Sequence, residues 1–119
     1  MDYTLKETKN YPGTKEQAFQ AIDLAAKGLQ GKITKQTPEK GEFVLFFEKT
    51  IHGQTLGDRT QMEVVVSVPE PGQVSFAMQS YPLDPVGRKL MFGARKGVNQ
   101  TVFTWFQAHL DNQMKKFSA

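Results

Sequence analysis

"QMEVVVSVPEPGQVSFAMQSY", residues 61–81, decides the fold class of this chain. Apolar side chains occupy alternate positions on both sides of a Pro-Glu-Pro-Gly turn: Met62, Val64, Val66 and Val68 before it, and Val74, Phe76 and Met78 after it. A period of two is typical of strands that bury one face, and such a turn joins antiparallel neighbours. The stretch therefore predicts a β-hairpin in an antiparallel sheet.

A second hairpin is expected upstream, from "KITKQ" (32–36) and "EFVLFFEKT" (42–50). The intervening "TPEKG" suits a turn because it contains Pro38 and Gly41. Residues 43–47 are all apolar, whereas a half-solvated strand alternates. We therefore expect the face of this strand opposite the first helix to be covered by another segment, a ligand or a partner.

The first helix is expected within "TKEQAFQAIDLAAKGLQG" (14–31). Thr14 and Gln17 have the spacing of a capping box, in which each side chain satisfies a backbone N–H of the other. Gly28 or Gly31 is expected to end the helix. Its core stripe recurs at helical spacing: Phe19, Ile22, Ala26 and Leu29.

The last helix is expected from Asn99, as the N-cap, through Phe117. Trp105 and His109 lie one turn apart on a stripe beside its core face. The core face itself comprises Val102, Phe103, Phe106, Leu110, Met114 and Phe117.

Adding "YTLKE" (3–7) as a first strand gives the order β-α-β-β-β-β-α. This order predicts an α+β two-layer sandwich, with an antiparallel sheet of about five strands and both helices on one side. All 119 residues fit one domain. The order is similar to the layout of TATA-binding-protein-like folds. With two further strands it would resemble the helix-grip layout of START-type lipid carriers.

Charge and composition argue against several kinds of partner and site. The net charge is +3, but the cations form no continuous stripe, so we predict no nucleic-acid partner. The absence of cysteine excludes disulfides and thiolate chemistry, and two histidines without clustered acids predict no metal site and no cofactor. Without a signal peptide or a run of about 20 apolar residues, we expect no membrane span and a cytoplasmic location.

The clearest candidate site is the basic stretch within "VGRKLMFGARKGVNQTVFTWFQ" (86–107). Arg88, Lys89, Arg95 and Lys96 surround an apolar segment in front of a helix N-terminus, whose free N–H groups favour anions. It is interpreted as a carboxylate, phosphate or sulfate site, with Arg95 and Lys96 as the charge partners. A solvated connector or a protein interface would explain the same residues. Just before it, Asp84-Pro85 predicts a short helical turn.

The aromatic residues exceed what a thin core needs, which favours an apolar cleft between the sheet and the last helix. An aromatic-rich core and a homodimer are the alternatives. We expect His109 at the mouth of the cleft and Arg88, Arg95 and Lys96 at its polar entrance. The predicted walls are Phe46, Met78, Phe92, Trp105 and Phe106.

Three functional hypotheses follow. The first is a non-enzymatic binding or interaction module, whose ligand is a small amphipathic acid or the acidic segment of a partner protein. The second is a small enzyme, a hydrolase or isomerase, that uses His52, Asp58 and Arg59 of the central loop "IHGQTLGDR". The third is a structural homodimer joined through the "FVLFF" strand or the last helix.

Overall fold

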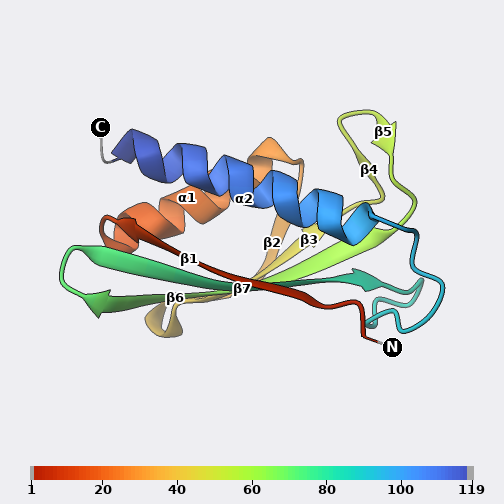
Figure 1. The fold of residues 1–119 in the computed structure, drawn as a ribbon, viewed down its shortest axis with the longest axis horizontal. Coiled ribbons are helices and arrows are strands. Elements are labelled where there is room, and N and C mark those ends of the chain that lie inside the picture. The colour runs from red at the N-terminus through yellow and green to blue at the C-terminus, as the bar shows by residue number, and fades with distance from the viewer. Residues whose placement is uncertain (1, 118–119) are drawn as a thin grey trace.

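A computed structural model describes residues 2–117 as an antiparallel sheet of five strands with two helices on one face (Figure 1). The predicted α+β two-layer arrangement and element order are confirmed. The elements are β1 (Leu5–Pro12), α1 (Lys15–Gly28), β2 (Lys32–Thr37), a 3-10 turn (Pro38–Lys40), β3 (Glu42–Phe47), β4 (Thr50–Ile51), β5 (Gln54–Thr55), β6 (Arg59–Glu70), β7 (Gln73–Leu83) and α2 (Val98–Phe117).

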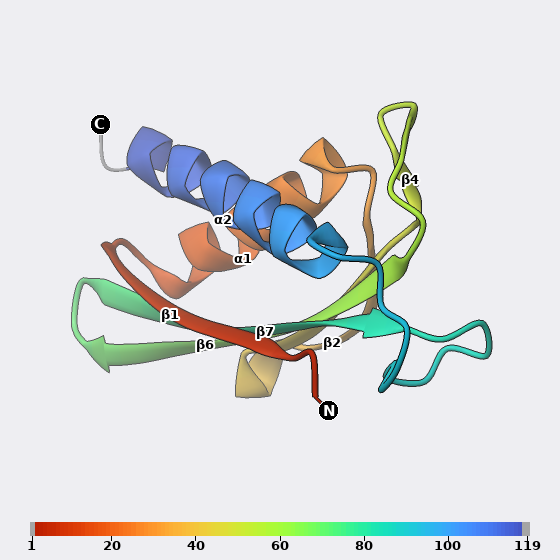
Figure 2. The same ribbon diagram turned by 45° about the vertical axis from the view of Figure 1, so that its right-hand side comes forward.

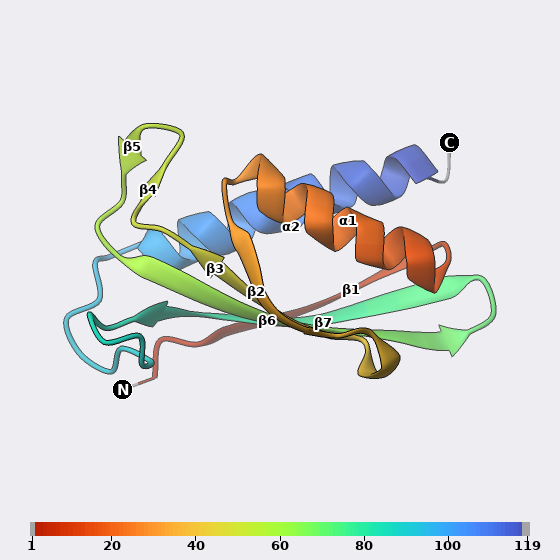
Figure 3. The ribbon, with the colours of Figure 1, turned by 180° about the vertical axis from the view of Figure 1, so that it is seen from behind.

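The main sheet has the strand order β1-β7-β6-β3-β2, with every pair antiparallel. Both predicted hairpins are present, as β2–β3 and β6–β7. The first strand pairs with the last, so that Leu5 lies opposite Ser80. A register shift between Ser67 and Glu70 leaves Val68 exposed at the tip of the β6–β7 hairpin. Both helices lie on the same side of the sheet in Figures 1 and 3.

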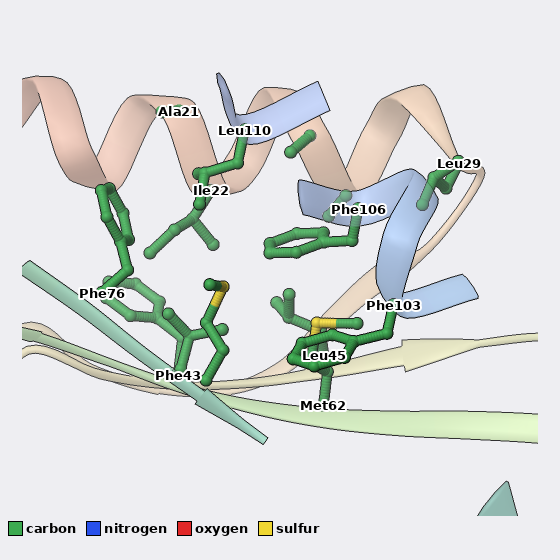
Figure 4. Packing of buried hydrophobic residues seen from close by; sticks show 14 of the residues in the cluster. Ala21, Ile22, Leu29, Phe43, Leu45, Met62, Phe76, Phe103, Phe106 and Leu110 are labelled. Carbon is green, nitrogen blue, oxygen red and sulfur yellow. The ribbon is translucent and has the colours of Figure 1, made fainter. Parts of the chain in front are cut away.

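The core fills the space between the sheet and the helices (Figure 4). The rings of Phe47 and Phe106 meet edge to face, with centroids 6.2 Å apart, and those of Phe19 and Phe43 do so at 5.0 Å. Phe103 is also buried here. Most of the aromatic surplus is therefore core, and the predicted cleft between the sheet and α2 is occupied by side chains.

The start of α1 follows the capping box that the sequence predicts. Thr14 Oγ1 accepts from the Gln17 N–H at 3.1 Å, and the Thr14 N–H donates to Gln17 Oε1 at 2.9 Å. The buried side of α1 is rich in alanine, at Ala18, Ala21 and Ala25, which lets the helix lie close to its neighbours.

The start of α2 differs from the prediction. The helix begins at Val98, and the Gly97 carbonyl accepts from the Thr101 N–H, so Asn99 is not its N-cap. Asn99 instead joins three parts of the fold. Its Nδ2 donates to the carbonyls of Tyr3 and Ser80, and its Oδ1 accepts from Ser80 Oγ at 2.6 Å. These partners are remote in sequence, so no local pattern indicates them.

Two other local predictions also need correction. The first strand begins at Leu5, not at Tyr3, and continues to Pro12. The central loop, residues 51–59, contains part of a small hairpin formed by β4 and β5. Asp84 does start a single turn, as the sequence predicts: its carbonyl accepts from the Gly87 N–H at 3.0 Å, and its Oδ1 caps the turn by accepting from the N–H groups of Val86 and Arg88.

The face of the sheet away from the helices is not covered by any segment of residues 2–117 (Figure 1). Val44 and Phe46 of β3 are half-buried on this open face by their neighbours in the sheet. Beside them Tyr81 donates to Glu63 Oε2 at 2.7 Å and accepts from Gln61 Nε2 at 2.8 Å. The all-apolar run 43–47 thus belongs to a strand with one fully buried face, so the expectation of a second covering segment is wrong.

Candidate functional site

A pocket of about 350 Å³ lies where the end of α1, the β4–β5 hairpin and the middle of α2 meet. Its volume lies within the range of small-molecule sites, and its walls are mainly apolar with a few polar groups, as in such sites. We call it the Trp–His pocket, defined by its lining residues Leu29, Ile51, His52, Gln54, Trp105, Ala108 and His109.

One wall of the pocket is supplied by α2. Trp105 and His109 are half-buried and stand one helical turn apart, beside the buried stripe that contains Phe106 and Leu110. The core stripe faces the sheet, so the neighbouring stripe is left facing the end of α1 and the β4–β5 hairpin. The periodicity of the last helix predicted this stripe correctly.

The approach of α1 to this wall depends on a residue without a side chain. A Cβ atom built on Gly28 would lie 2.7 Å from His109 Nδ1, which is closer than real Cβ contacts. Glycine at this position therefore lets the His109 imidazole lie against the last turn of α1. Leu29 follows as the C-cap and contributes an apolar side chain to the pocket.

The β4–β5 hairpin is fastened to the end of α1 by two hydrogen bonds. The His52 N–H donates to Gln30 Oε1 at 2.7 Å, and His52 Nε2 lies 2.6 Å from the Gly28 carbonyl oxygen. Since a carbonyl only accepts, His52 Nε2 carries the proton of this bond. Both Gln30 and His52 adopt left-handed backbone conformations, with φ of 59° and 50°. These bonds hold Ile51 and His52 over the pocket.

The catalytic candidates do not converge. Asp58 accepts from the backbone N–H of Arg95 at 2.7 Å, and its carboxylate lies 4.0 Å from Arg95 Nε. Arg59 faces Glu48 at 3.6 Å. His52 is bonded to α1 instead. Asp58 and Arg59 line a shared hollow of about 280 Å³, but His52 lines the Trp–His pocket instead. The geometry thus brings together no pair of His52 with Asp58 for acid–base chemistry.

The predicted cationic entrance is spread along an exposed loop. Arg88 lies 3.6 Å from Asp84, and Lys89 Nζ stands 4.6 Å from the centroid of the Tyr81 ring. Arg95 and Lys96 line a separate hollow of about 260 Å³ at the start of α2, which also contains Asp58. None of these cations lines the Trp–His pocket.

The predicted apolar walls also separate. Met78 and Phe106 are buried in the core, Phe46 lies on the open face, and Phe92 is 79% exposed in the loop before α2. Of the predicted ligand-contacting residues, only Trp105 and His109 line the Trp–His pocket. Sequence reasoning missed Leu29, Ile51, Gln54 and Ala108 as lining residues. The available signal was the apolar Ile51 directly before His52 in a loop of mixed polarity.

Two negative findings apply to the described part of the chain. Residues 2–117 contain no group of three His, Asp or Glu side chains placed to hold a metal ion. Neither α1 nor α2 is long and apolar enough to cross a membrane.

Comparison with known proteins gives a fold and no family. No known protein family and no curated protein matches the sequence. Among solved structures, TTHA0849 from Thermus thermophilus is similar with a TM-score of 0.51 and 9% identity, over 98% of this chain and 99% of that one. Ara h 8.0201 is similar with a TM-score of 0.45 and 14% identity, over 95% and 98%. At these identities the likeness to TTHA0849 concerns the fold alone.

Proposed function

We propose that this protein is a non-enzymatic binding module, and that it takes a small amphipathic acid in the Trp–His pocket. One observation carries the proposal: the fold brings together side chains from α1, the β4–β5 hairpin and α2 around a mainly apolar hollow of ligand size. The indole of Trp105 and the aliphatic groups of Leu29 and Ile51 would contact the apolar body of the ligand.

The polar group of the ligand would meet the two imidazoles. His52 uses Nε2 to bond the Gly28 carbonyl, so its Nδ1 side is directed elsewhere. His109 has its Nδ1 side against Gly28, which leaves the opposite edge of its ring for other partners. A protonated imidazole donates a charge-assisted hydrogen bond to a carboxylate. A carboxylic acid therefore suits this site better than a neutral hydrocarbon.

The alternative of a small enzyme has less support. Acid–base catalysis by His52 and Asp58 would need both groups within hydrogen-bond reach of one substrate. Asp58 is instead bonded to the backbone of Arg95, at the base of the loop before α2. A binding role needs only the pocket.

The fluorescence of Trp105 tests the proposal, because it is the sole tryptophan of the chain. Octanoic acid, an amphipathic acid that does not absorb near the tryptophan band, is the probe. We expect a saturable change in Trp105 emission. Ala108→Phe should fill the pocket from α2 and weaken octanoate binding by at least about tenfold, the effect of losing about 1.4 kcal/mol.

Ala77→Phe is the matched control, because Ala77 is an exposed alanine on the open face of the sheet. It should leave octanoate binding unchanged. The absence of a saturable signal would contradict the proposal. So would equal weakening by the two substitutions, because the ligand would then bind outside the pocket or only to a general apolar surface.

A further inference from the structure

The loop between β7 and α2, residues 85–97, exposes bulky apolar side chains, and it lies outside the Trp–His pocket. Val86 is 71% exposed, Phe92 is 79% exposed, and Met91 is also exposed. Of the five large apolar side chains exposed in residues 2–117, three belong to this loop. Exposed apolar side chains that cluster in this way are typical of a docking surface.

The same loop is the reason that the net charge of the chain is positive. It contains four of the fifteen Lys and Arg residues and none of the twelve Asp and Glu residues. The other residues therefore contribute eleven cations against twelve acids, which is close to neutrality. Arg88 and Arg95 have the acids Asp84 and Asp58 only at the two ends of the loop, and both guanidinium groups stay largely exposed.

Hydrogen bonds hold the loop in this exposed conformation. The Leu90 N–H donates to the Pro82 carbonyl at 2.8 Å, and the Asp84 N–H donates to the Arg88 carbonyl at 2.7 Å. At the far end the Arg95 N–H is held by Asp58. The backbone bonds on both sides of Phe92 thus fix the segment that presents its ring to solvent.

The loop projects from one end of the molecule, beyond the sheet and the start of α2 (Figure 2). A projecting apolar side chain needs a surrounding that deforms around it, whereas a protein partner would need a matching pocket and roughly 800 Å² of its own surface. Lipid headgroups and acyl chains give way around an inserted ring, and acidic headgroups attract the flanking cations. The geometry therefore favours a membrane surface over an acidic protein segment.

We propose that residues 85–97 dock the protein on an anionic lipid surface, with Phe92 and Met91 inserted between headgroups. Arg88, Lys89, Arg95 and Lys96 would contact the lipid phosphates and carboxylates. The glycines at positions 87, 93 and 97 have positive φ and open space around them, so the backbone has room to approach the headgroups. This surface and the Trp–His pocket share no lining residue, so either proposal can fail alone.

Sedimentation with vesicles tests the docking. Vesicles of phosphatidylcholine with one third phosphatidylserine are compared with pure phosphatidylcholine vesicles at about physiological salt. We expect binding to the anionic vesicles only. The double variant Met91→Ser, Phe92→Ser should weaken binding by at least about tenfold. Arg88→Gln and Lys96→Gln should each weaken it about fivefold.

Two matched controls leave the loop intact. Val68→Ser removes an exposed apolar side chain from the tip of the β6–β7 hairpin, and Lys27→Gln removes an exposed cation from α1. Both should bind as the unaltered chain does. No binding to anionic vesicles, or weakening by the controls equal to that by the loop variants, would overturn the proposal. So would weaker binding with Arg88→Gln but not with Met91→Ser, Phe92→Ser, because that result indicates electrostatic attraction to the headgroups without insertion of the apolar side chains.

Insertion has its own readout. Phe92→Trp in a Trp105→Phe background places the single indole on the loop. We expect its emission to shift to shorter wavelength on anionic vesicles, because the ring leaves water. An unshifted spectrum with bound protein would overturn the placement of Phe92 in the membrane.

Discussion

At Gly28 the absence of a side chain sets how closely α1 approaches α2 beside the pocket. The His109 imidazole occupies the space that a Cβ atom would take. Gly28 is the last residue of α1, where glycine costs less than the roughly 1 kcal/mol that it costs in a helix interior relative to alanine. The chain therefore has a glycine at the place where the end of α1 packs against His109 beside the pocket.

Gly28→Ala tests that interpretation. Helix propensity alone would raise the free energy of unfolding, by less than about 1 kcal/mol at this terminal position, but the new Cβ displaces His109. We therefore expect no gain in stability from the single substitution and weaker octanoate binding. In a His109→Ala background this gain in the free energy of unfolding should return. Urea denaturation of the four chains measures this coupling, and an equal gain in both backgrounds would contradict it.

Tyr11 makes stability depend on alkaline pH. Burial raises the pKa of Tyr11 to about 12, and the nearby Asp111 carboxylate adds to the shift. The folded pKa lies above the ordinary value near 10, so folding favours the protonated phenol. This contribution is fully present below about pH 10 and is lost as the pH rises toward about 12.

Tyr11→Phe should flatten this decline. The phenylalanine variant cannot ionise, so its free energy of unfolding should fall less between about pH 9 and about pH 11.5. Burial also raises the pKa of Tyr81, so part of the decline should remain. Urea midpoints across this range measure the effect. Parallel curves for the two chains would contradict it.

Among the elements, the β4–β5 hairpin is the one that the Trp–His pocket needs most. It has two residues in each strand, and it stands apart from the main sheet in Figure 1. A pair this short is not stable alone, so its position depends on the contacts of His52 with the end of α1.

Gln30→Ala should loosen this hairpin. It removes the acceptor of the His52 N–H and leaves an alanine in a left-handed conformation. We expect faster hydrogen exchange at the His52 amide and weaker octanoate binding, with the amides of β6 and β7 unchanged. Gln20→Ala, at an exposed position of α1, should leave both unchanged. Unaltered exchange at His52 in Gln30→Ala would show that the bond does not hold the hairpin.

Elements whose buried residues recur periodically can be predicted from the sequence. Features that depend on contacts between residues far apart in the sequence cannot. Val64, Phe76 and Phe106 repeat at strand or helix spacing, so their burial could be inferred. The Trp–His pocket could not, because it depends on His52 meeting Gly28 across 24 positions. The same reason explains Asn99, whose side chain serves Tyr3 and Ser80 rather than its own helix.

The open face of the sheet is one candidate surface for self-association of the protein. It offers Val65, which is 42% exposed, and the half-buried Phe46, but these two are not neighbours. Val65 lies opposite Glu42 and Phe46 lies opposite Gln61, with Glu63 between them on β6. A stable homodimer needs a larger and more apolar surface than this. The core face of α2, the other candidate for an interface, is buried within the fold.

We therefore expect the protein to sediment as one chain at micromolar concentration. Phe46→Lys, on the open face, should leave the sedimentation coefficient unchanged. A dimer that Phe46→Lys converts to a monomer would contradict this prediction and would support the homodimer hypothesis instead.

The position of β1 also decides when folding can finish. Within residues 2–117 its only partner in the sheet is β7, so β1 waits after its own synthesis until about residue 83 has been made. Pairing across most of the chain is slow, because the intervening segment must lose its freedom before the contacts form. The nascent chain therefore keeps β1, and the edge of β6 that later pairs with β7, without a partner until β7 has been made. That interval is when it would most need a chaperone.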